Sequence, residues 1–304
     1  MSATSLGQEG LIALMVLVGV LFVGTLVLST YAVVMRSVHV AQERETRERT
    51  ERWRDPADIG IAMGIRGTDV ARGAADIVLT DDNFASIVEA VEEGRRQYAN
   101  IRKFVAYLAC TNFGEVMAVF ANVVSGAPLV LLPIQILWVN LVTDSATALS
   151  LGLEPAERNL MKERPRKVGQ GILDRQLLVA LCIIGTYIGG ATLALYHWYL
   201  AGAQSGHANS MAFTSLVVLS TVSVVNFRSL QSPLSEIDWR SNQWLLIAIL
   251  LMLSMQVLGL YWPPLQTALH TRPLGGSDWI ILLLIVLPVI MLGEFYKMIK
   301  RRAQ

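Results

Sequence analysis

Residues 104–120 read Phe-Val-Ala-Tyr-Leu-Ala-Cys-Thr-Asn-Phe-Gly-Glu-Val-Met-Ala-Val-Phe, and residues 132–144 read Leu-Pro-Ile-Gln-Ile-Leu-Trp-Val-Asn-Leu-Val-Thr-Asp. The two segments are apolar enough to form a membrane hairpin, yet together they carry five notable polar side chains: Asn112, Glu115, Asn140, Thr143 and Asp144. Spacings of three and four residues place each set on one face of a helix. Such groups are costly at membrane depth unless they meet each other, water or a cation. The hairpin therefore predicts a polar site inside a membrane bundle.

The composition is that of an integral membrane protein. Of the 304 residues, 53% are hydrophobic and 16% are charged, and the hydrophobic residues fall in long runs. A helix needs about 20 such residues to cross the hydrocarbon core. The sequence predicts an all-α polytopic membrane protein with seven transmembrane helices, at residues 11–35, 104–125, 132–153, 173–200, 211–227, 244–262 and 279–298. The lipid bilayer is the expected partner, because the predicted spans need it. The net charge of +1 gives no indication of nucleic-acid binding.

The positions of Lys and Arg predict the orientation of the chain. Basic residues follow alternate spans, in the segments 36–54, 158–167, 228–240 and 297–302. Under the positive-inside rule these segments lie in the cytoplasm. We therefore expect the N-terminus outside and the C-terminus in the cytoplasm, in the plasma (inner) membrane.

A short α/β pattern precedes the hairpin. Residues 57–63 and 77–80 are typical of buried strands, and residues 70–75 of a short helix between them. Two strands and a helix cannot bury a core of their own, so this piece is typical of the edge of a larger α/β domain. From Phe84 the pattern is helical and contains no proline before Pro128, which favours one rod that enters the membrane from the cytoplasmic side.

The polar face of the hairpin predicts a cation site. Carboxylate, amide and hydroxyl oxygens are hard donors that suit Ca²⁺, Mg²⁺, Mn²⁺ or Na⁺. The alternative is a hydrogen-bond cluster that only holds the helices together. An aspartate facing a glutamate favours the cation site, because like charges do not hold helices together.

Four segments resemble the type II P-type cation-transporting ATPases, and most closely their calcium-pump branch. The segments are Ala57-Asp-Ile-Gly-Ile-Ala-Met-Gly-Ile-Arg-Gly-Thr-Asp-Val-Ala71, Ala74-Ala-Asp-Ile-Val-Leu-Thr-Asp-Asp-Asn-Phe84, Asn112-Phe-Gly-Glu115 and Leu137-Trp-Val-Asn-Leu-Val-Thr-Asp144. The resemblance runs from about Ala57 to the C-terminus. It implies that the last six spans correspond to the family's fifth to tenth membrane helices. It also implies that Asn112, Glu115, Asn140, Thr143 and Asp144 are the cation ligands.

The resemblance also predicts the domain organisation. We expect an N-terminal anchor helix at residues 1–36, a charged cytoplasmic linker at 37–56, a truncated remnant of the HAD-like phosphorylation domain at 57–83, a cytoplasmic stalk helix at 84–103, and a six-helix cation-ATPase membrane domain at 104–304.

Several motifs of the family do not occur in this sequence. The aspartyl-phosphate motif Asp-Lys-Thr-Gly-Thr and the actuator motif Thr-Gly-Glu are missing, and Glu51-Arg-Trp-Arg-Asp-Pro56 stands where the magnesium-binding segment is expected. Phosphoryl transfer needs a nucleophilic carboxylate, bound Mg²⁺ and a nucleotide pocket. We therefore expect no catalytic residues, no nucleotide bound by this chain alone and no autonomous ATP hydrolysis.

The leading hypothesis is the cation-binding C-terminal half of a pump, which depends on a separately encoded catalytic half. Its cation is expected to be Ca²⁺, with Mn²⁺ or Na⁺ as alternatives. A rival hypothesis is a non-enzymatic regulator of an intact pump. A third is an inactive, truncated pump.

Overall fold

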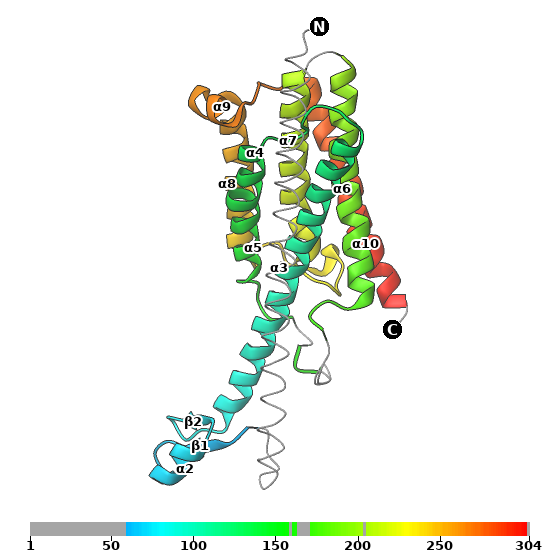
Figure 1. Ribbon diagram of the computed structural model, residues 1–304. Helices are drawn as coiled ribbons and strands as arrows, with labels where there is room; N and C mark the ends of the chain where they lie inside the picture. Colours follow the sequence, from blue (N-terminus) through cyan, green and yellow to red (C-terminus); the bar gives the residue numbers. More distant parts are fainter. Residues whose placement is uncertain (1–58, 158–159, 163–170, 203–204, 303–304) are drawn as a thin grey trace. The chain divides into compact units, whose positions relative to one another are not determined.

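A computed structural model describes residues 59–157, 160–162, 171–202 and 205–302 (Figure 1). The helix predicted at 11–35 and the linker predicted at 37–56 lie outside the described residues. Within the described residues, six helical segments are long and apolar enough to cross a membrane: Ala85–Val124, Pro133–Leu151, Arg175–Ala201, Ser205–Phe227, Gln243–Tyr261 and Gly276–Arg301. The prediction of a mostly helical, multi-pass membrane protein is confirmed. The seventh span and the HAD-like origin of the α/β part stay predictions.

Contacts divide the chain into two compact units between Phe84 and Ala85. The described part of the first unit contains strand β1 (Ile61–Met63), helix α2 (Asp69–Ala74) and strand β2 (Ile77–Leu79). The strands pair in parallel with Ile61 opposite Ile77, as two strands joined by a crossover helix do. Thr68 caps α2 by accepting a hydrogen bond from the Ala71 amide. The predicted order of strand, helix and strand is present.

The turn after β1 is held by a glycine and an aspartate. A Cβ atom on Gly64 would lie 2.6 Å from the Leu79 carbonyl oxygen, so only glycine allows this approach of the two strand ends. The Asp82 carboxylate accepts hydrogen bonds from the amides of Ile65 (2.9 Å) and Arg66 (2.7 Å). These bonds, led by the one from Ile65, hold the pKa of Asp82 below its ordinary value because they stabilise the charged form. The carboxylate thus fastens the turn at neutral pH.

The second unit begins with helix α3 (Ala85–Val124), which is 40 residues long and unbroken. At 1.5 Å per residue it extends about 60 Å, twice the thickness of a hydrocarbon core. The predicted rod is therefore confirmed, because the amphipathic segment and the first arm of the hairpin form one helix.

Helices α3 and α6 (Arg175–Ala201) pack closely side by side (Figure 1). A Cβ on Gly189 would lie 2.3 Å from the Gly114 carbonyl oxygen, and one on Gly185 would lie 2.7 Å from the Cys110 carbonyl oxygen. Small residues let two membrane helices touch through their backbones. This contact fixes α3 in the bundle.

The second arm of the hairpin is not a uniform α-helix. Helix α4 (Pro133–Trp138) continues into a π-helical segment, η1 (Val139–Asp144), and then into α5 (Ser145–Leu151). In a π-helix each backbone hydrogen bond joins residues i and i+5, which is one residue further apart than in an α-helix. The Ser145 hydroxyl donates to the Asn140 carbonyl five residues earlier (2.9 Å), which satisfies an acceptor within the wide turn. The π-turn was not predicted, because residue spacing alone does not reveal it.

Helix α7 (Ser205–Ser223) and the 3₁₀ turn η3 (Val224–Phe227) lie in the middle of the bundle and are almost wholly buried. The predicted span at 211–227 starts too late, because the polar residues before it are also helical. One of them, Asn209, accepts a hydrogen bond from Gln135 (2.7 Å) and donates one to the Val130 carbonyl (2.9 Å). Buried partners, which the sequence does not display, make this polar turn part of the helix.

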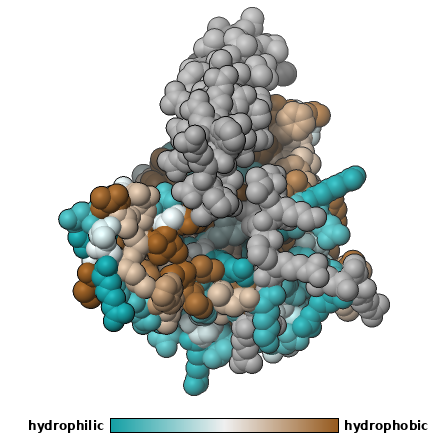
Figure 2. All heavy atoms as spheres, turned by 90° about the horizontal axis from the view of Figure 1, so that it is seen from below, coloured by the Kyte–Doolittle hydropathy of each residue, from teal (hydrophilic) through white to brown (hydrophobic). Residues whose placement is uncertain are grey.

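Three further helices complete the bundle: α8 (Gln243–Tyr261), the short α9 (Pro263–Leu269) and α10 (Gly276–Arg302). Helices α8 and α10 are the least buried of the six spans, and their large apolar residues, such as Leu250 and Leu283, point outward. An outward apolar surface suits contact with lipid. Among the coloured atoms of Figure 2, hydrophilic side chains gather around the lower rim of the face that is seen from below.

Candidate cation site

Glu115 of α3 and Asn140 of η1 meet across the hairpin. Glu115 is 7% exposed, and its two carboxylate oxygens accept hydrogen bonds from the Asn140 amide nitrogen at 3.1 and 2.9 Å. The same nitrogen also donates to the Ile136 carbonyl (3.0 Å), which sets the orientation of the amide. Because the nitrogen is used in this way, the Asn140 amide oxygen is the atom of this group that is suited to a cation.

Asp144, at the end of η1, is held by two hydroxyls of α3. It is 1% exposed, and its carboxylate accepts hydrogen bonds from Tyr107 (3.1 Å) and Thr111 (2.7 Å). The Thr147 hydroxyl of α5 donates in turn to the Tyr107 oxygen (2.8 Å). A buried carboxylate needs such donors, because burial without them strongly disfavours its charged form.

Tyr107 and Thr111 were missed as members of the site, although the sequence contains a signal for them. Together with Glu115 they recur every four residues along α3. Residues at that spacing lie above one another on one helix face. The polar face of α3 that contacts the second arm therefore extends from Tyr107 to Glu115, which is further than Asn112 and Glu115 alone indicated.

The other two predicted ligands lie nearby but are bonded differently. Asn112 is partly exposed, and its amide nitrogen donates to the Leu108 carbonyl of its own helix (2.8 Å). Thr143 is 1% exposed and directly precedes Asp144 in η1. Among the described residues, no hydrogen bond joins Asn112 or Thr143 to the other three predicted ligands.

The π-helical segment carries all three predicted ligands of the second arm. Its wide turn lies where Asn140 faces Glu115 and Asp144 faces Tyr107. Single π-turns inside α-helices occur frequently at functional sites, because they redirect side chains and free backbone groups. The irregular backbone thus coincides with the polar contacts between the two arms.

The donor set fits a hard cation. Two buried carboxylates, amide oxygens and hydroxyls are the ligands that Ca²⁺ accepts, and six to eight oxygens complete its coordination. In the described part of the chain, no three or more His, Cys, Asp and Glu side chains are grouped so that they could hold a metal ion. A cation here would therefore take most of its ligands from amide, hydroxyl, backbone or water oxygens. The same contacts also suit a hydrogen-bond cluster, so the geometry alone fits both interpretations.

Comparisons with known proteins show which family the chain is similar to. Residues 128–299 match the family model described as "Cation transporting ATPase, C-terminus". The chain is 38% identical over 274 residues to the endoplasmic reticulum-type calcium-transporting ATPase 3 of Arabidopsis thaliana, covering 81% of this chain and 27% of that protein. It is 41% identical over 229 residues to a calcium-transporting ATPase of Bacillus subtilis, covering 75% and 26%. With the endoplasmic reticulum calcium ATPase srcA of Aspergillus fumigatus the identity is 36% over 278 residues, covering 81% and 28%. The chain thus spans about a quarter of the length of these curated relatives.

Proposed function

This chain belongs to the cation-transporting P-type ATPases, as the C-terminal membrane half of a calcium-type member, and from that premise we propose that it is the cation-binding half of a pump. The observation that carries the proposal is the pair of buried carboxylates, Glu115 and Asp144, each held by polar partners from the facing helix. Ionisable residues buried inside a membrane bundle are rare, and they typically mark ion or substrate pathways or proton relays. Asn112, Glu115, Asn140, Thr143 and Asp144 are the proposed ligands.

The proposed cation is Ca²⁺. The relatives from Arabidopsis thaliana and Bacillus subtilis are named calcium-transporting, and the oxygen donors of the hairpin suit this hard ion. Inside this site the protein would hold the ion with two negative charges, which match the charge of a divalent cation and not that of a monovalent one. Mn²⁺ and Na⁺ are the competitors to be tested beside it.

A calcium titration of the purified protein in detergent micelles tests the proposed site. We expect weak, saturable heat with a Kd of about 10⁻⁴ M, because only two carboxylates contribute charge. Mn²⁺ and Na⁺ titrations under the same conditions rank the alternatives. An absence of saturable heat for all three ions would contradict the proposal and favour the hydrogen-bond cluster.

We further propose that phosphoryl transfer is supplied by a separate catalytic half. The sequence contains no Asp-Lys-Thr-Gly-Thr motif. The α/β unit also exposes apolar surface: Ile65 is 73% and Val70 is 82% exposed, and α2 buries none of its residues. A two-stranded sheet of this size needs further strands for stability. A catalytic half that adds strands beside β1 and β2 would cover that surface by β-augmentation.

Affinity purification from the native membrane tests this dependence on a partner. We expect to recover a second polypeptide that carries the phosphorylation motif. The C-terminal part of this polypeptide should supply the strands that are missing beside β1. Deleting residues 57–83 is expected to release it, whereas the Asp144→Asn variant retains it as a matched control. Recovery of an intact pump instead would favour the regulator hypothesis, and recovery of neither would favour an inactive protein.

We also propose that the protein lies in the plasma (inner) membrane and that the C-terminal end of α10 faces the cytoplasm. Lys297, Lys300 and Arg301 follow its apolar part, as the positive-inside rule requires of a cytoplasmic end. The relatives from Arabidopsis thaliana and Aspergillus fumigatus are named for the endoplasmic reticulum, which is the alternative location. Fractionation of the native membranes distinguishes the two locations.

A further inference from the structure

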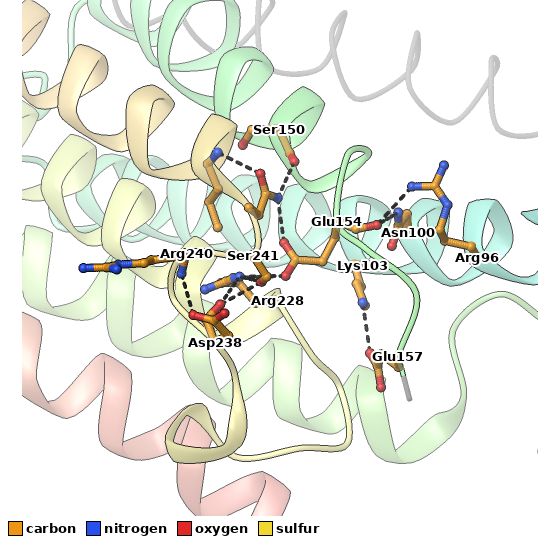
Figure 3. A network of polar contacts seen from close by, with 12 residues as sticks. Arg96, Asn100, Lys103, Ser150, Glu154, Glu157, Arg228, Asp238, Arg240 and Ser241 are labelled. Atoms are coloured by element: carbon orange, nitrogen blue, oxygen red, sulfur yellow. Dashed lines mark hydrogen bonds and ion pairs between the residues drawn. The ribbon is translucent and has the colours of Figure 1, made fainter. Parts of the chain in front are cut away.

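A buried ion pair lies at the ends of the helices below the candidate site. Arg228 follows η3 and is 2% exposed, and Glu154 lies just beyond α5 and is 4% exposed. The Arg228 guanidinium donates two hydrogen bonds to one carboxylate oxygen of Glu154, at 3.1 and 2.9 Å (Figure 3). From the sequence, Arg228 was interpreted only as a cytoplasmic basic residue.

The pair is connected to the start of α8. The second carboxylate oxygen of Glu154 accepts a bond from Asn242 (2.6 Å), which also caps α8 through the Leu245 amide. Arg228 donates further bonds to the Ser241 hydroxyl (2.9 Å) and to the Asp238 carbonyl (3.2 Å). Both charges are therefore satisfied without water, as a buried ion pair requires.

Helix α3 is fastened to the same residue. The Asn100 amide nitrogen donates to the Glu154 carbonyl (2.7 Å) and to the Gly152 carbonyl (3.1 Å). Arg96, one turn earlier, also reaches the Glu154 carbonyl (3.4 Å; Figure 3). Glu154 thus joins three helical segments through its backbone and its side chain: the interior of α3 at Asn100, the end of η3 at Arg228 and the start of α8 at Asn242.

The contacts between the two arms form an antiparallel ladder whose lowest rung is at Glu154. Above it, three rungs follow in order, with α3 numbers rising as second-arm numbers fall: Tyr107 with Thr147, Thr111 with Asp144, and Glu115 with Asn140. A helix rises 1.5 Å per residue, so an axial slip of one residue would break every rung. The lowest rung is the one that is also anchored to α8 and to Arg228.

We propose that Glu154, held by Arg228, is a positioning residue for the cation site, which sets the axial register of α3 against the π-helical segment. This inference rests on the proposed function for its effect on cation affinity. A buried ion pair adds little stability compared with apolar residues of similar size, but it is specific in geometry. Its role is therefore to fix which residues of the two helices face each other.

The Glu154→Gln variant tests the proposal. It weakens the bond to Arg228, and the calcium Kd is expected to rise about tenfold, as for other residues that orient metal ligands without touching the metal. Glu236→Gln is the matched control, because Glu236 pairs with Arg301 at 2.9 Å and both side chains are about half exposed. We expect the control to bind calcium as the unchanged protein does. An unchanged Kd in Glu154→Gln would overturn the proposal.

Two further measurements separate positioning from general stability and from the proposed function. The rate of backbone hydrogen exchange at residues 139–144 should increase in Glu154→Gln, while the rate in α6 stays constant. If the substitution changes the rates in both segments equally, the positioning role is overturned, even if the protein binds no calcium. The double variant Glu154→Leu with Arg228→Met replaces both charges by apolar groups and should recover the unfolding temperature. If it also recovers calcium affinity, the pair is merely structural.

Discussion

The Asp144→Asn variant is expected to lose calcium binding while it keeps its fold. Asparagine has nearly the same shape as aspartate, and its amide oxygen still accepts a bond from Thr111 or Tyr107. It lacks the negative charge, and the number of charged ligands is what chiefly sets calcium affinity in oxygen sites. With one carboxylate left in Glu115, we expect the calcium Kd to rise about 100-fold or more, measured by isothermal titration.

Fold and binding can be separated in the same experiment. Replacing a buried carboxylate by a neutral amide removes a desolvation cost, so the unfolding temperature of the variant should be unchanged or higher. Asp69→Asn is the control, because the Asp69 side chain is 94% exposed on α2. Equal heat from Asp144→Asn and from the unchanged protein would remove Asp144 from the site. A collapse of the unfolding temperature would show that its hydrogen bonds to α3 are structural.

The Gly189→Ala variant is expected to disrupt the contact between α3 and α6. The added methyl group would lie 2.3 Å from the Gly114 carbonyl oxygen, and backbone atoms cannot move aside as a flexible side chain can. Forcing one extra carbon into a packed interface costs about 1–3 kcal/mol. Because α3 carries Tyr107, Thr111 and Glu115, its displacement should also weaken calcium binding. Thermal unfolding in detergent measures the first effect and titration the second.

The neighbouring glycine supplies a matched control. A Cβ on Gly190 would have no atom within 4 Å, so Gly190→Ala adds the same group to open space. Alanine is favoured over glycine in a helix interior by about 1 kcal/mol, and we expect this variant to be as stable as the unchanged protein or slightly more so. Similar losses in both variants would mean that the close approach of α3 and α6 does not hold the bundle together.

The fold follows from local features of the sequence to a large extent. The spans could be predicted because a run of apolar residues long enough to cross a bilayer has little alternative to a helix. Helix α3 could be predicted as one rod because no proline interrupts residues 85–124. The errors in the predicted spans lie at helix ends. One is at residues 205–210, where hydrogen bonds to buried partners make polar residues part of α7.

The sequence by itself determined the six described spans and which polar residues share a face within each arm, because hydrophobic length and residue spacing are local properties. Only the tertiary structure decided the π-turn at 139–144, the bonds of Tyr107 and Thr111 to Asp144, and the ion pair of Glu154 with Arg228. The bonds to Asp144 and the ion pair of Glu154 with Arg228 all join side chains at least 33 residues apart in the sequence. Whether such groups meet depends on the packing and register of whole helices, which no local pattern encodes.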